Sequence, residues 1–114
     1  MKNDIIRQNL VLPEFQMVDE RELDEDREYL TQLYPAKARL IMVMVEDECD
    51  KLEYEGSPMF AKYPDKETLL GISRGIYHKV SAGEDANLKH LIEVMMCNEF
   101  CYRRSRYKRR RKFF

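Results

Sequence analysis

Three side chains that commonly bind metals fall near one line in the second half of the chain. His90, Cys97 and Cys101 recur at helical spacing, and all three residue types are zinc ligands. At a rise of 1.5 Å per residue, however, His90 is about 16 Å from Cys101, so one straight helix cannot bring all three to one ion. Cys97 and Cys101 are about 6 Å apart on this rise and would need Cys49 or an acid as a further ligand. Because free cysteine is also a common core residue, we predict no metal site.

Two glutamates fall at the edges of apolar helix faces. Glu48 and Glu99 could share a proton or a metal and so acquire acid–base chemistry. A di-metal carboxylate bundle would show Glu-x-x-His pairs on two helices, whereas here His90 precedes Glu93 in the reverse order. We expect Glu48 and Glu99 to pair with a nearby lysine or arginine instead. No catalytic residue, cofactor or small-molecule ligand is predicted, which favours a protein that is not an enzyme.

The strongest signal is a run of eight cations near the carboxyl terminus. Such a run favours a polyanion, because binding to phosphates releases condensed counterions, and Tyr102 and Tyr107 are available to stack on bases. Three alternatives remain open: pairing with an acidic helix of this chain or a neighbour, contact with an anionic membrane surface, or simple solvation. The predicted polyanion-binding residues are Arg103, Arg104, Arg106, Lys108, Arg109, Arg110, Arg111 and Lys112.

Positive and negative charges are segregated along the sequence. Residues 14–55 hold 14 acids and 5 bases, whereas residues 102–114 hold 8 bases and no acid, although the formal net charge is only −1. This asymmetry indicates electrostatic contact with an external polyanion or with the protein's own acidic half.

Length and composition set the class of protein. A chain of 114 residues with 44% hydrophobic and 36% charged residues suits one soluble domain. No window approaches the roughly 20 apolar residues of a membrane span, and no secretory signal is visible. Three cysteines without a disulfide pattern favour reduced thiols, so we expect a cytoplasmic location.

Helices must position these candidate residues. We predict that the segment 37–54 is the central helix. Apolar residues recur there at helical spacing over a wide face, which predicts an all-α bundle of three to four helices. The positions that define this face are Ala38, Ile41, Val45, Cys49 and Leu52.

Other elements follow from start and stop signals. Residues 18–34 form an acidic helix that ends before Pro35, and Gly56 caps the central helix. A single turn over 59–63, a helix from Asp65 or Lys66 to Val80, and a last helix starting near Glu84 complete the bundle. We therefore divide the chain into an extended arm (1–17), a helical bundle (18–102) and a basic extension (103–114).

Two pairs of residues mark a predicted partner interface. Met96 and Phe100 project from the back of the last helix, so either the helix is covered on two sides or an apolar patch is open for a partner. Gly71 and Gly75 each cost up to about 1 kcal/mol in a helix interior, so either another backbone approaches them closely or the helix is simply weak. A homodimer joining the last helices, each basic tail reaching the other chain's acidic helix, would explain both the patch and the charge split.

Short segments in the middle third resemble a group of small uncharacterised proteins of Gram-positive anaerobes. They are Tyr34-Pro35, Glu48-Cys49-Asp50, Glu53 to Met59, and Tyr63-Pro64-Asp65. The resemblance implies a self-contained small bacterial protein and carries over no functional residue. From the residues themselves we expect an interaction protein that assembles with itself or a protein partner, or alternatively a nucleic-acid-binding protein acting through residues 103–112.

Overall fold

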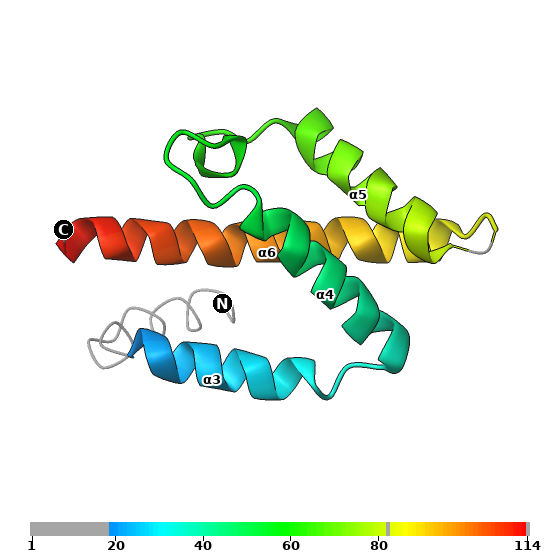
Figure 1. The fold of residues 1–114 in the computed structure, drawn as a ribbon, viewed down its shortest axis with the longest axis horizontal. Coiled ribbons are helices and arrows are strands. Elements are labelled where there is room, and N and C mark those ends of the chain that lie inside the picture. The colour runs from blue at the N-terminus through cyan, green and yellow to red at the C-terminus, as the bar shows by residue number, and fades with distance from the viewer. Residues whose placement is uncertain (1–18, 82, 114) are drawn as a thin grey trace, which may run out of the picture. The chain divides into compact units, whose positions relative to one another are not determined.

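The structure of the chain is a computed structural model in which residues 19–81 and 83–113 are described. These residues form four α-helices and one 3-10 turn, and they contain no strand (Figure 1). The prediction of a small all-α bundle is therefore confirmed. The arm expected at residues 1–17 lies outside the described residues. Two compact units divide the chain, residues 1–33 and 34–114, and each is described by itself.

In the first unit, α3 (Glu20–Thr31) is a short acidic helix. Asp19 caps it, because one carboxylate oxygen accepts a hydrogen bond from the backbone N–H of Arg21 at 3.1 Å. The helix is shorter than the predicted 18–34, since this cap starts it at Glu20 and the chain turns at Gln32, before Pro35. None of its residues is buried, and Leu30 is 55% exposed.

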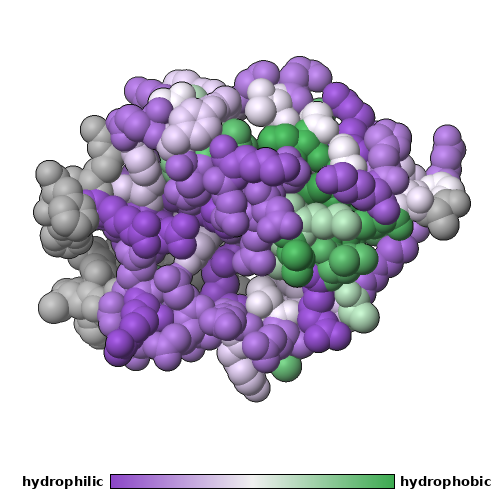
Figure 2. All heavy atoms as spheres, in the orientation of Figure 1, coloured by the Kyte–Doolittle hydropathy of each residue, from purple (hydrophilic) through white to green (hydrophobic). Residues whose placement is uncertain are grey.

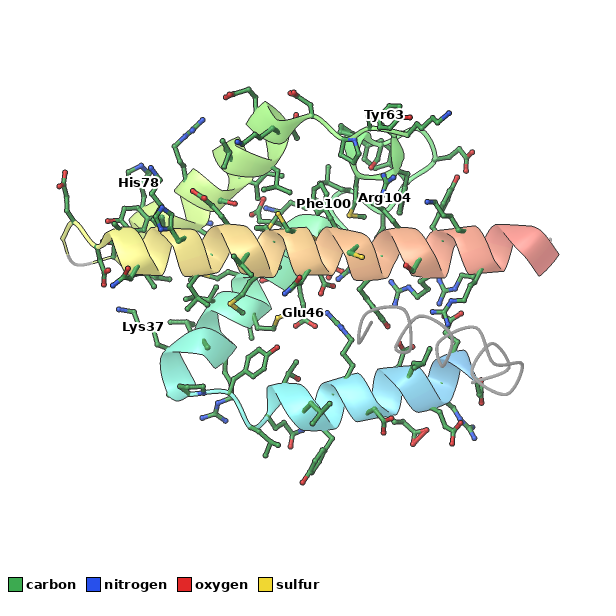
Figure 3. The ribbon with its side chains drawn as sticks, turned by 180° about the vertical axis from the view of Figure 1, so that it is seen from behind. Lys37, Glu46, Tyr63, His78, Phe100 and Arg104 are labelled. Carbon is green, nitrogen blue, oxygen red and sulfur yellow. The ribbon has the colours of Figure 1, made fainter. Side chains whose placement is uncertain are left out.

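The second unit is built on α6 (Ala86–Phe113), whose 28 residues make it the longest helix. Both α4 (Ala36–Asp50) and α5 (Lys66–Val80) pack against it on one side, the side turned to the viewer in Figure 1 and turned away in Figure 3. The turn η1 (Pro58–Phe60) also contacts α6. Hydrophobic residues gather around α4 and α5 in Figure 2.

The core follows the predicted face of the central helix. Ile41, Val45 and Cys49 are fully buried, and they contact the buried side of α6. From α5, Ser73 and Ile76 are buried while Leu69, Ile72 and Val80 pack against the core. The buried residues of α6 are Leu88, Ile92, Met95, Met96, Glu99, Phe100 and Arg103.

The end of the central helix differs from the prediction. The helix stops at Asp50 rather than near Tyr54, with Lys51 as its C-cap. Gly56 does adopt the left-handed conformation, with a φ of 84°, but it does so in the loop that follows rather than as the cap. That loop leads to Ser57, whose hydroxyl oxygen accepts a hydrogen bond from the N–H of Met59 at 3.0 Å and starts η1. The turn covers 58–60, not 59–63.

α5 begins at its predicted start, and α6 begins at Ala86, two residues after the predicted Glu84. Asp65 is the N-cap of α5, and the Asp85 carboxylate accepts a hydrogen bond from the N–H of Leu88 at 3.1 Å at the start of α6. α6 then runs without a break past residue 102. The boundary that we place between bundle and basic extension is therefore not a break in secondary structure.

Candidate functional site

A buried arginine joins α6 to the end of α4. Arg103 donates to the carboxylate of Glu99 at 2.7 Å through Nε, and through Nη1 to Asp50 at 2.8 Å and Glu53 at 3.1 Å. The Glu99 side chain is fully buried and that of Arg103 is 7% exposed, whereas Asp50 is 65% exposed. We call these four residues the arginine cluster.

Paired charges make the arginine cluster stable in a dry environment. Burial alone would lower the pKa of Arg103, but its hydrogen bonds to Glu99 and Asp50 outweigh that effect and raise the pKa above its ordinary value. The guanidinium therefore stays charged and supplies the partner that a buried Glu99 needs. As predicted, Glu48 also pairs with a lysine, Lys51 at 3.0 Å.

The three thiols differ sharply in their surroundings. Burial, helped by the charge of Glu99, raises the pKa of Cys49 from 9.0 to about 12. At neutral pH this thiol is protonated, so it is a poor nucleophile and a poor metal ligand. Cys97 and Cys101 are free and exposed. No group of three metal-binding side chains occurs among the described residues.

Arg104 of α6 binds the backbone of η1 and of the residues after it. Its guanidinium donates to the carbonyl oxygens of Met59 at 2.9 Å and Lys62 at 3.2 Å, and also to that of Ala61. Figure 3 shows Arg104 beside the loop that carries Tyr63. The five N–H groups of an arginine suit this task, because one planar group satisfies several carbonyls that no helix or sheet pairs.

The next turn of α6 makes a second attachment to the same loop. The Arg106 guanidinium lies 3.0 Å from the carboxylate of Glu53 and 5.3 Å from the ring centre of Tyr102. The Tyr107 ring stacks on Phe60 with centroids 4.1 Å apart, and its hydroxyl donates to Glu55 at 2.7 Å. Tyr107, which we predicted to stack on bases, thus already stacks on a ring of its own chain.

The basic run therefore has two parts. Arg103, Arg104, Arg106 and Tyr107 bind carboxylates, carbonyls and a ring of their own unit. Beyond them Lys108 and Arg110 are exposed and Arg109 is half-buried, while the side chains of Arg111 and Lys112 lie outside the described part of the chain. Pairing of the basic run with an acidic helix of the same chain was one of the alternatives left open by the sequence. The partners of Arg103, Arg104, Arg106 and Tyr107 given above belong to α4, to α6 itself and to the segment after α4.

The predicted apolar patch on the back of the last helix is wrong. Met96 is fully buried and Phe100 is 4% exposed, because α4, α5 and η1 cover the side of α6 on which they lie. These two residues therefore belong to the core, and it is the opposite side of α6 that is exposed. Leu91, on the other side of the same helix, is 41% exposed.

The two glycines of α5 lie in open surroundings. Both are exposed, and a Cβ built at Gly75 would meet no atom within 4 Å, while one at Gly71 would meet only an Arg74 side-chain atom at 4.0 Å. No other backbone among the described residues approaches them. Their role in a contact with a second subunit remains a prediction.

The outward side of α6 carries a regular series of exposed residues. Its positions alternate by four and three residues, the spacing of a coiled-coil seam, and every one of them is exposed. Leu91 and Val94 are 41% and 55% exposed. The first six positions are uncharged, in a chain of which 36% is charged. We call this series the heptad face: Asn87, Leu91, Val94, Asn98, Cys101, Ser105 and Lys108.

The heptad face was not predicted from the sequence, because a search for apolar periodicity discounts its asparagine, serine and lysine positions. Comparisons of the chain with protein-family models, curated proteins and solved structures find no match. Among the described residues, no helix combines the length and the apolar character that a membrane crossing requires. Function must therefore be argued from the arginine cluster and the heptad face.

Proposed function

We propose that this chain is a non-enzymatic interaction protein that binds a protein partner through the heptad face of α6. The observation that carries the proposal is the uncharged, heptad-spaced series from Asn87 to Ser105 on a helix whose opposite side is already buried. A surface helix ordinarily exposes charged and polar residues on its solvent side. A second helix packs against residues at this 4-3 spacing where they are apolar, as Leu91, Val94 and Cys101 are here.

The buried polar groups support a structural rather than a catalytic role. Arg103 and Glu99 bind each other, and the thiol of Cys49 is held protonated. None of these groups is both reactive and open to a substrate. The proposal includes a reducing location such as a bacterial cytoplasm, since Cys97 and Cys101 are exposed free thiols on the binding side.

Photo-crosslinking in cells tests the proposed function. A photoreactive amino acid is placed at Val94, on the heptad face, and separately at Val43, a valine on the outward side of α4. Position 43 is a matched control for position 94, because the side chains of Val94 and Val43 are 55% and 54% exposed. We expect a protein adduct from position 94 and none from position 43. Absence of any adduct at 94, or equal adducts at both positions, would overturn the proposal.

Nucleic-acid binding is the second candidate, and one observation favours it. α6 stays helical beyond Tyr107 and carries Lys108 and Arg110 there as exposed cations. A helix that carries such cations suits the backbone phosphates of RNA or DNA.

The test of this candidate must spare residues 103–107, because removing them would also remove the arginine cluster. We therefore compare the full chain with the double variant Lys108→Gln and Arg110→Gln in RNA and DNA retention over a salt series. If nucleic acid is the partner, the variant binds less and its affinity depends less steeply on salt. Equal binding, or none by either protein, would reject this candidate.

A further inference from the structure

We infer that the partner on the heptad face is a second copy of this chain, with the two α6 helices antiparallel. This inference rests on the proposed function and names its partner. The heptad face spans about 27 Å from Asn87 to Ser105 at 1.5 Å per residue, enough for several layers of a helix pair. If two copies of the heptad face pack across a twofold axis, the same residues are buried on both copies. This is the arrangement of the commonest dimers.

Charge decides the direction of the pair. The amino-terminal end of α6 follows two exposed acids, Glu84 and Asp85, and its carboxyl-terminal end carries Lys108 and the arginines after it. A parallel pair would bring the two basic ends together. An antiparallel pair instead sets each basic end beside the acids of the other copy, where opposite charges attract and also fit the ends of the two helix dipoles.

The heptad positions fix a register for this pair. In an antiparallel coiled coil the residues of one heptad series face those of the other, which sets Val94 opposite Asn98 of the second copy and Leu91 opposite Cys101. Glu84 then lies opposite Lys108 of the second copy. In the same register the two Cys101 thiols are several helical turns apart, whereas a parallel in-register pair would set them side by side.

Sedimentation equilibrium of the full chain is the first test. We expect a dimer at micromolar concentration, and we expect Val94→Glu to weaken it by about tenfold or more, since a buried carboxylate without a partner opposes association. The matched control Val43→Glu leaves the dimer unchanged. Circular dichroism checks that both variants stay folded, which we expect because both positions are exposed.

Zero-length crosslinking with a carbodiimide tests the direction. Glu84 and Lys108 of one chain are about 36 Å apart along α6, so a bond between them can form only across two copies. We expect that bond in a mixture of unlabelled and isotope-labelled chains, and no disulfide between two Cys101 thiols under mild oxidation of a Cys97→Ser variant. A Cys101 disulfide without the carbodiimide bond would overturn the antiparallel pair.

Failure of this inference is distinct from failure of the proposed function. A chain that stays monomeric through high micromolar concentration at both low and high salt overturns the inference. Dissociation by Val43→Glu but not by Val94→Glu also overturns it. If a position-94 crosslink in cells nevertheless joins the monomeric chain to another protein, the proposed function stands with a different partner.

Discussion

The two sides of α6 differ in what their residues contact. The inward side carries Ile92, Met96, Glu99 and Arg103, all buried against α4, α5 and η1 or bound to their carboxylates. The outward side carries the heptad face, which no described residue of its own unit covers. The comparison shows that one helix completes a small core on one side and exposes a second surface on the other. It also shows that the buried side holds a charged pair, whereas the first six positions of the heptad face are uncharged.

The largest expected effect is on the inward side. Arg103→Met leaves Glu99 buried without its partner, which we expect to reduce the free energy of unfolding by about 3–5 kcal/mol in urea titrations. Lys108→Met, on the outward side, is the control and should change it by less than about 0.5 kcal/mol. The double variant Glu99→Met and Arg103→Met should recover much of the loss, because a buried ion pair can be replaced by apolar groups at little cost. Equal stability of the two single variants would show that Arg103 does not support the fold.

The apolar part of the same side should respond next. Met96→Ala removes a fully buried side chain and should cost about 2–5 kcal/mol, whereas Val94→Ala, at a position 55% exposed, should cost little. Thermal unfolding followed by circular dichroism, at a dilution where the chain is monomeric, compares them. If both substitutions cost the same, the division of α6 into two sides would be wrong.

A smaller effect belongs to the second attachment of the loop. Tyr107→Leu removes the stack on Phe60 and the hydrogen bond to Glu55, so we expect a loss of about 0.5–1.5 kcal/mol in unfolding free energy. Tyr63→Leu, at a tyrosine 83% exposed, is the matched control. No difference between the two variants would mean that residues beyond Arg106 do not hold the loop.

The smallest effect is a difference in thiol chemistry. In the folded chain at pH 8, diluted until it is monomeric, Cys97 and Cys101 should react with a disulfide reagent while Cys49 reacts only after unfolding. Because the pKa of Cys49 is about 12 when folded and near 9 when unfolded, the folded state retains a proton that the unfolded state releases. Its contribution to stability is therefore present below pH 9 and is lost as the pH rises toward 12, and Cys49→Ala should flatten that loss. If all three thiols reacted at the same rate in the folded chain, the buried position of Cys49 would be contradicted.

Helices with clear caps and a continuous apolar face could be predicted from the sequence. The face of Ile41, Val45 and Cys49 is such a case, and the start of α5 after Asp65 is another. The end of α4 could not be placed from Gly56, because a left-handed glycine serves a loop as readily as a cap and only the packing of the loop decides.

The side of α6 that is buried was harder to predict, because two charged residues belong to it. Ile92, Met96, Glu99 and Arg103 recur at the spacing of one helix face, but a search for apolar periodicity discounts the glutamate and the arginine. The signal that could have identified this face is their spacing of four residues, which allows a pair to bind on one side of a helix. The carboxylates from α4 and its loop, some 50 residues away, could not be inferred from local pattern.

Alkylation of Cys101 in a Cys97→Ser variant tests the central claim most directly. The rate is measured by mass spectrometry in cells and in the purified chain diluted until it is monomeric, with Cys49 as the internal buried reference. If the heptad face binds protein, Cys101 reacts severalfold more slowly in cells than in the dilute chain. Equal rates would show that the outward side of α6 faces solvent in both settings and would contradict the claim.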